Sequence, residues 1–296
     1  MGGRSSTLQN SHLLPANQKL VGLSNLANSC SFASVLQALF HLPCFQRGLN
    51  SIRELFASLD AFPRNVGYIE PRGFISALRQ CDRYSEPEQQ DAHEFFSFLL
   101  QRLPDSLTHF FQGTAKYVTT CLNCNHSYTS SQSFIDIPIE MSDKNLSLSA
   151  IVNDIFVPES MSNDDAIHCS NCNQRGEGER VFALESLPPV LILHLKRFRY
   201  HFEEKTFTKI SKKVNIPSMF SLRDTKFYLH SCIIHVGQFF FQGHYIAVIR
   251  LPNSSLWAVF DDDRVEIIFD YQLERYFGSI ENCHAVVYMA IYQQHL

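Results

Sequence analysis

Residues 22–39 read GLSNLANSCSFASVLQAL, and they predict a buried helix with a cysteine in its first turn. Ser29 is the expected N-cap of this helix, and Pro43 is expected to end it. Free backbone N–H groups and the helix dipole favour a thiolate at Cys30. Most cysteines at such positions are simply small buried side chains, so this thiol alone does not identify a nucleophile. The apolar stripe that indicates the helix comprises Phe32, Val35, Leu36, Leu39 and Phe40.

A second helix is predicted over 89–103, QQDAHEFFSFLLQRL, which Pro104 follows. Asp91 and Glu94 lie three residues apart on its polar side, and Ser85 with Glu88 has the spacing of a capping box. The buried stripe comprises Ala92, Phe95, Phe96, Leu99, Leu100 and Leu103.

Strand patterns replace helical ones after about residue 110. The clearest strands are VLILHLKRF (190–198), YIAVIR (245–250), LWAVF (256–260) and AVVYMAIY (285–292). Residues 252–255, PNSS, are a strong turn signal between the second and third of these strands. The sequence therefore predicts an α+β fold in which one multi-lobed domain, 20–293, follows a flexible tail, 1–19.

His244 lies just before one strand of this hairpin, and three aspartates, at 261–263, follow the other strand. A turn centred near residue 253 places His244 opposite about residue 262. An acid there can orient the imidazole toward a thiol, as in enzymes with a Cys, His and acid triad. A solvated acidic turn beside a surface histidine is the alternative, and the pattern does not choose among the three aspartates.

Two Cys-x-x-Cys pairs indicate a tetrahedral zinc site with four thiolate ligands: Cys121 with Cys124, and Cys169 with Cys172. The alternative is a pair of redox motifs, but no thioredoxin-like βαβ pattern surrounds them. His168 is an unneeded fifth candidate ligand, and His126 is expected to be a polar loop residue.

The formal net charge of -4 and the pI of about 6.3 argue against nucleic acid and against an anionic membrane as partners. No apolar run has transmembrane length, and the polar N-terminus does not resemble a signal peptide. We therefore expect a cytoplasmic or nuclear protein whose nine cysteines are not a disulfide framework. Gly2 and Ser6 fit the loose N-myristoylation pattern, although a plain disordered tail is the favoured interpretation.

Together these segments resemble the ubiquitin-specific protease family of cysteine proteases. The resemblance runs in order through nearly the whole chain, from about residue 22 to residue 292. The matching motifs are GLSNLANSCSFASVLQAL (22–39), QQDAHEFF (89–96), the paired Cys-x-x-Cys, LPPVLILHLKRF (187–198), and GHYIAVIR (243–250) with LWAVFDDDRV (256–265).

The resemblance implies a papain-like right hand. Its thumb would span about 20–105, its zinc-bearing β fingers about 110–185, and its palm about 186–293. Ubiquitin would lie on the fingers, with its C-terminal tail running between thumb and palm to Cys30. Details near His244 look most similar to the group regulated by WD-repeat partners.

The resemblance also implies residue roles. Cys30 matches the nucleophile, His244 the base and Asp261 the third member of the triad. Asp262 matches an auxiliary acid, and Asn25 an oxyanion-hole amide. The motif that binds the basic tail of ubiquitin is matched by Gln89, Asp91 and Glu94.

The sequence departs from the family near the nucleophile, with Ala27 in place of Gly, Ser31 in place of Tyr and Ala33 in place of Asn. A Gly to Ala change restricts the backbone beside the oxyanion hole. Because Cys30, His244 and Asp261 are intact, an active deubiquitinase is still the first hypothesis. A poorly cleaving module that binds ubiquitin and a protease for a ubiquitin-like modifier are the alternatives.

Overall fold

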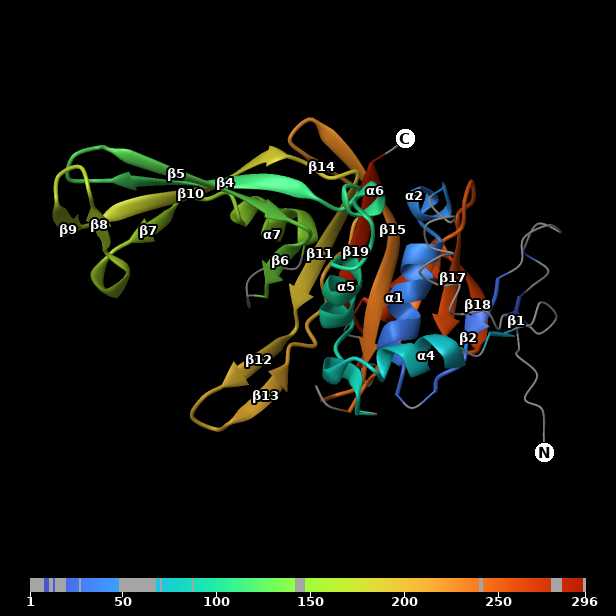
Figure 1. Ribbon diagram of the computed structural model, residues 1–296. Helices are drawn as coiled ribbons and strands as arrows, with labels where there is room; N and C mark the ends of the chain where they lie inside the picture. The colour runs from blue at the N-terminus through green and yellow to red at the C-terminus, as the bar shows by residue number, and fades with distance from the viewer. Residues whose placement is uncertain are drawn as a thin grey trace.

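The computed structural model describes residues 8–10, 13, 20–26, 28–47, 68–69, 71–86, 88–141, 147–239, 242–277 and 284–294. A helical part lies against a large sheet, and a narrow β arm projects away from both (Figure 1). We call these parts the thumb, the palm and the fingers. Within the described ranges, no helix has the length and apolar character needed to cross a membrane.

The palm is a nine-stranded sheet in the order β1-β18-β17-β16-β15-β19-β11-β6, with β14 paired to β15 outside that path. Strand β19 lies between β15 and β11 and pairs antiparallel with both. Its residues from Val286 to Tyr292 are all buried, as expected of a strand covered on both faces. The strands are β1 (Leu8–Gln9), β6 (Ile137–Glu140), β11 (Val190–Lys196), β14 (Met219–Leu222), β15 (Thr225–Val236), β16 (His244–Arg250), β17 (Leu256–Asp261), β18 (Arg264–Phe269) and β19 (Val286–Gln294).

The thumb is built around α1 (Cys30–Phe40), which packs against palm strand β16 and against α5 (Ala92–Leu100). Every residue of α1 before Phe40 is buried, so both polar and apolar side chains of this helix lie inside the protein. The Phe32 ring lies 4.6 Å from the Phe95 ring, and burial of each such side chain contributes roughly 1.5–3 kcal/mol. The other thumb elements are α2 (Pro43–Arg47), α4 (Arg72–Leu78), η3 (Asp82–Tyr84), α6 (Asp105–Thr108) and the parallel pair β2 (Gly22–Leu23) with β3 (Tyr68–Ile69).

The fingers are a four-stranded sheet in the order β5-β4-β10-β7, which carries a separate hairpin, β8 with β9, near its tip (Figure 1). The register places Cys121 at the end of β4 opposite Gly178, so the first Cys-x-x-Cys pair begins on the last residue of this strand. The strands are β4 (Gly113–Cys121), β5 (Ser127–Phe134), β7 (Glu159–Met161), β8 (Ile167–Cys169), β9 (Gln174–Gly176) and β10 (Gly178–Ser186).

The remaining elements are the hairpin β12 (Phe198–His201) with β13 (Thr206–Lys209), helix α7 (Leu148–Asp154), and the 3-10 helices η4 (Asn163–Asp165) and η5 (Asp270–Tyr276). Strand β6, within the predicted fingers range of 110–185, pairs with β11 and is therefore part of the palm. The lobes are thus less separate in the sequence than predicted.

Three local predictions were wrong. The second helix begins at Ala92 and ends at Leu100, so it is shorter than 89–103. Asp91 caps it, because its carboxylate accepts the Glu94 N–H, and the Ser85 hydroxyl of the predicted capping box donates instead to the Asp82 carbonyl oxygen. Within the predicted flexible tail, Leu8–Gln9 pairs in parallel with β18 as an edge strand. Gly2 and Ser6 lie outside the described residues.

Candidate active site and metal centre

Cys30 is the first residue of α1 and is only 3% exposed. The preceding loop is folded on itself by two hydrogen bonds. The Ser29 backbone N–H donates to Asn25 Oδ1 at 2.9 Å, and the Leu26 backbone N–H donates to the Ser29 hydroxyl oxygen at 2.9 Å. Ser29 therefore stabilises the loop and does not cap α1 with its side chain, contrary to its predicted role.

His244 is the first residue of β16 and joins two of the other predicted catalytic residues. Its Nε2 lies 2.6 Å from Asp261 Oδ1, and the Cys30 thiol is close enough to raise the pKa of the imidazole. Because Nε2 is engaged with Asp261, Nδ1 is the ring nitrogen left for the thiol. The three side chains come from the start of α1, the start of β16 and the end of β17.

The register of the hairpin explains how two consecutive aspartates reach one imidazole. The pairs Ala247↔Phe260 and Arg250↔Trp257, continued along the strands, place His244 opposite residue 263, within one residue of the predicted position near 262. Asp261 is thus a diagonal neighbour of His244. Asp262 has a φ of +55°, and this left-handed turn interrupts the alternation of a strand.

Asp262 connects His244 to the loop before Cys30. Its Oδ2 lies 3.8 Å from His244 Nε2 and accepts a hydrogen bond of 3.0 Å from Asn25 Nδ2. Its backbone carbonyl oxygen accepts the Leu23 N–H at 2.9 Å. A Cβ on Gly22 would lie 2.7 Å from that same carbonyl oxygen, so glycine is required for this approach.

The electrostatics of the group favour a protonated imidazole. Burial alone would lower the pKa of His244, but the Asp261 hydrogen bond, the Cys30 thiol and the Asp262 charge together raise it to about 10. The hydrogen bond to His244 holds the pKa of Asp261 below its ordinary value, whereas burial raises the pKa of Asp262. Asp261 therefore stays ionised and stabilises an imidazolium.

Asn25 has a fixed amide orientation. A backbone N–H can only donate, so the atom that accepts from Ser29 is the oxygen, and the amide nitrogen faces Asp262. One N–H of this exposed amide remains after the bond to Asp262. The oxyanion role of Asn25 stays a prediction.

Each predicted substrate-binding residue has a partner within the chain. Asp91 Oδ1 accepts the backbone N–H of Glu94 at 2.9 Å, and Asp91 Oδ2 accepts from the hydroxyls of Tyr245, at 3.3 Å, and Tyr288. The exposed Glu94 carboxylate lies 2.9 Å from an Arg83 guanidinium nitrogen. Gln89 contacts the residue before His244. No motif had indicated the two tyrosines, although one of them directly follows His244.

The four finger cysteines form a compact cluster. Their sulfur atoms all lie within 4.8 Å of one another, with Cys121 and Cys172 at 4.0 Å and Cys124 and Cys169 at 3.6 Å. A tetrahedral zinc with bonds of about 2.3 Å needs sulfurs roughly 3.8 Å apart, so the donor set fits that metal. His126 and His168 are not members of the cluster.

The two Cys-x-x-Cys turns, which we call knuckles, share one backbone conformation. Asn125 and Asn173, each directly after the second cysteine of a pair, have φ values of +58°. Their N–H groups donate, at 2.8 Å each, to the carbonyl oxygens of Cys121 and Cys169 respectively. The Tyr128 hydroxyl, 3.0 Å from the Cys169 sulfur, is the main cause that lowers the pKa of this thiol to about 6.

Two of the three departures near the nucleophile are described. Ser31 and Ala33 are both buried in α1, where small side chains fit between the helix and its neighbours. Ala27 lies outside the described residues. Asn28, directly before Ser29, has a φ of +62°, a conformation that asparagine tolerates better than most residues.

Comparisons with known proteins agree with this architecture. Two similar relatives are ubiquitin carboxyl-terminal hydrolase 12 of Salmo salar and probable ubiquitin carboxyl-terminal hydrolase 9 of Schizosaccharomyces pombe. The first is 28% identical over 339 residues, covering 94% of this chain and 90% of the relative. The second is 28% identical over 267 residues, covering 81% of this chain and 45% of the relative, so the chain spans less than half of that protein.

Solved structures confirm the predicted fold. A chain from the SAGA DUB module Ubp8/Sgf11/Sus1/Sgf73 bound to monoubiquitin has a TM-score of 0.77 and 22% identity, covering 94% of this chain and 70% of that chain. A chain from the same module bound to ubiquitin aldehyde has a TM-score of 0.77 and 21% identity, covering 96% and 72%.

The family model described as ubiquitin carboxyl-terminal hydrolase matches residues 21–292. This match spans the thumb, fingers and palm, and it confirms the resemblance that the sequence motifs had indicated. The chain belongs to the ubiquitin carboxyl-terminal hydrolase family.

Proposed function

We propose that the chain is a thiol-dependent deubiquitinase that hydrolyses the peptide or isopeptide bond after the C-terminal glycine of ubiquitin. The observation that carries the proposal is the contact of one imidazole, His244, with both the Cys30 thiol and the Asp261 carboxylate. Family membership supports ubiquitin and ubiquitinated proteins as the substrates.

The geometry supports a two-step mechanism. His244 takes the proton of Cys30, and the thiolate attacks the glycine carbonyl carbon to form a tetrahedral intermediate. Backbone N–H groups at the start of α1 and the Asn25 amide are the proposed donors to its oxyanion. The His244 proton then passes to the departing amine, which leaves a thioester. Water, deprotonated by the same imidazole, hydrolyses the thioester and restores the thiol.

Asp261 and Asp262 have separate proposed roles in this mechanism. Asp261 fixes the ring through Nε2 and stabilises its charge. Asp262 holds Asn25 at 3.0 Å and adds negative charge 3.8 Å from the same ring nitrogen. The auxiliary acid thereby couples the base to the oxyanion donor.

We also propose that zinc occupies the finger cluster through Cys121, Cys124, Cys169 and Cys172, because four sulfurs at these separations suit that ion. Its role is structural, since it joins the knuckle after β4 to the hairpin of β8 and β9. A WD-repeat protein is proposed as an activating partner on the motif resemblance alone. A cytoplasmic or nuclear location is also proposed, since a site of four thiolates suits a compartment in which thiols stay reduced.

A ubiquitin probe with a C-terminal electrophile tests the function. We expect covalent labelling at Cys30, none in Cys30→Ser, and retained non-covalent binding by that variant. Tight binding of the wild-type protein without labelling would favour the ubiquitin-binding module. Labelling by a ubiquitin-like probe in place of ubiquitin would favour a different modifier.

A further inference from the structure

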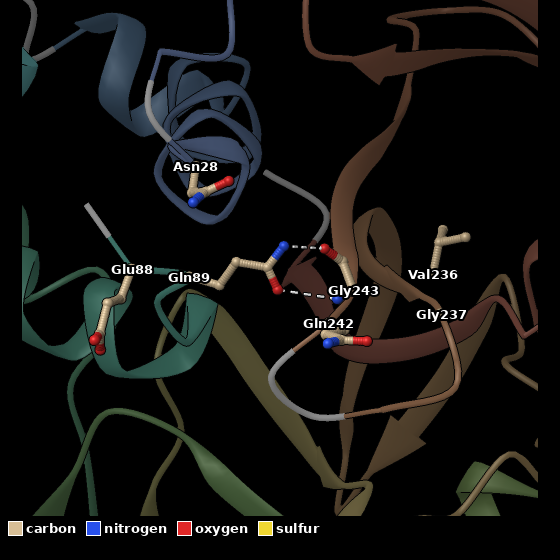
Figure 2. Close-up of a pocket in the computed structure, with 7 residues that line it drawn as sticks. All are labelled: Asn28, Glu88, Gln89, Val236, Gly237, Gln242 and Gly243. Atoms are coloured by element: carbon tan, nitrogen blue, oxygen red, sulfur yellow. Dashed lines mark hydrogen bonds between the residues drawn. The ribbon is translucent and has the colours of Figure 1, made fainter.

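The Gln89 side chain joins the thumb to the palm directly beside the candidate base. Its Nε2 donates to the Gly243 carbonyl oxygen at 2.6 Å, and its Oε1 accepts the Gly243 N–H at 2.9 Å. Figure 2 shows both bonds and the side chain that spans the space between the two parts. A primary amide that donates and accepts at one residue reproduces the pairing of a backbone peptide unit.

Gly243 also packs closely against the ring of His235. A Cβ at this position would lie 2.1 Å from His235 Nε2 and 2.4 Å from Cε1 of the same ring. His235 is fully buried, and neither ring nitrogen has a hydrogen-bond partner among the described residues. Burial lowers the pKa of His235 to about 3, so an uncharged ring packs against the Gly243 backbone.

The residue on the other side of His244 is bound to the same thumb segment. The Tyr245 hydroxyl donates to Asp91 Oδ2 at 3.3 Å. Gln89 and Asp91, two residues apart, therefore bind the residues directly before and after His244 in the chain. The His244 side chain bonds Asp261, and its backbone pairs with Val236 at the start of β16.

We propose that Gln89 is a positioning residue, which clamps the Gly243 backbone between its amide and the His235 ring and thereby fixes where His244 presents its imidazole to Cys30. This inference rests on the proposed function and reassigns a residue that the family motif had marked as substrate-binding. The amide is exposed at the surface, but both of its functional atoms are engaged by Gly243.

Steady-state cleavage of ubiquitin bearing a C-terminal fluorophore tests the clamp. In Gln89→Ala we expect kcat to fall about tenfold, since two hydrogen bonds are lost, while KM stays within twofold. Gln90→Ala is the matched control, because among the described residues that adjacent amide bonds only the Glu88 carbonyl oxygen, at 3.5 Å, and we expect it to leave both constants unchanged. A raised KM with unchanged kcat would mean that Gln89 binds substrate, and two unchanged constants would mean that the clamp is dispensable. Either result overturns the proposal.

Alkylation of Cys30 by iodoacetamide supplies a readout without ubiquitin. If the clamp holds the imidazole beside the thiol, Gln89→Ala slows alkylation at neutral pH and moves the rising limb of the pH profile to higher pH. Thermal unfolding of the variant verifies that the fold is retained. A wild-type protein that alkylates normally but cleaves no ubiquitin would disprove the proposed function, and the alkylation profiles would still decide the role of Gln89. Identical profiles for the two proteins would disprove the clamp.

Discussion

Replacement of Asp261 by Asn removes one charge beside His244 and preserves the shape of the side chain. The Asp261 carboxylate lies 2.6 Å from the ring nitrogen, and a hydrogen bond to a charged group contributes about 1.5–3 kcal/mol. Because this side chain is 49% exposed, solvent screening favours the lower part of that range, about 1.5–2 kcal/mol. We therefore expect kcat/KM for a ubiquitin-fluorophore substrate to fall roughly 10–30-fold.

The same variant must change the pH dependence. The pKa of His244 is raised from 6.5 to about 10, so the imidazolium persists from neutral pH up to that value and is lost above it. The Asp261 hydrogen bond is the largest of the contributions that raise this pKa. In Asp261→Asn the alkaline limb of the kcat/KM profile, recorded from about pH 6 to 11, should therefore move to lower pH.

Asp263→Asn, in the same turn, is the control and should behave as the wild-type protein. The reasoning would be refuted if Asp261→Asn kept full activity with an unmoved alkaline limb, or if only the Asp263 variant lost activity.

Four further outcomes are expected. Because the pKa of His244 is raised on folding, its contribution to stability is complete below about pH 6.5 and is lost as pH rises through about 10. In urea, the free energy of unfolding of Asp261→Asn should therefore be lower than that of the wild-type protein at pH 6 and equal to it at pH 11. Metal analysis of the purified protein should find one zinc per chain, and Cys172→Ala should lower the zinc content and the melting temperature; a zinc-free protein with normal stability would contradict this site. Glu94→Ala should weaken ubiquitin binding several-fold in a binding titration without loss of fold, whereas unchanged affinity would leave this residue a solvated partner of Arg83. Arg197→Met should lower the free energy of unfolding by about 3 kcal/mol in urea, because the fully buried guanidinium donates to the carbonyl oxygens of residues 210, 212 and 287; a change below about 1 kcal/mol would contradict that role.

The sequence predicted the elements of the candidate active site better than it predicted their geometry. The spacing of apolar residues and the turn residues at 252–255 predicted α1 and the β16–β17 hairpin, because a buried face gives a strong pattern over many residues. The alternation of side chains between the two faces of β17 could not choose between Asp261 and Asp262, since this alternation holds only in an unbroken strand. The left-handed backbone at Asp262, which brings both acids to one ring, leaves no periodic trace in the sequence.

Contacts between distant segments were the hardest to predict. Gln89 and Gly243 lie 154 positions apart, and an exposed glutamine has no pattern that reveals its partner. The opposite holds for the finger cysteines, because thiolate chemistry restricts what two Cys-x-x-Cys pairs can do. Strand β6 was placed in the wrong lobe for a related reason, since a short strand does not show which sheet edge it joins.

The place of β19 in the palm affects how the protein is made. Residues 286–294 leave the ribosome after every other strand of the sheet, yet they separate β15 from β11 and pair with both. Until then the nascent chain carries two unpaired apolar edges in the middle of its future palm, and such edges promote association with other chains. A ribosome that stalls before residue 286 would release a product with Cys30, His244 and Asp261 all present and no closed sheet to hold them. We expect such a product to depend on chaperones and to be degraded in preference to the finished enzyme.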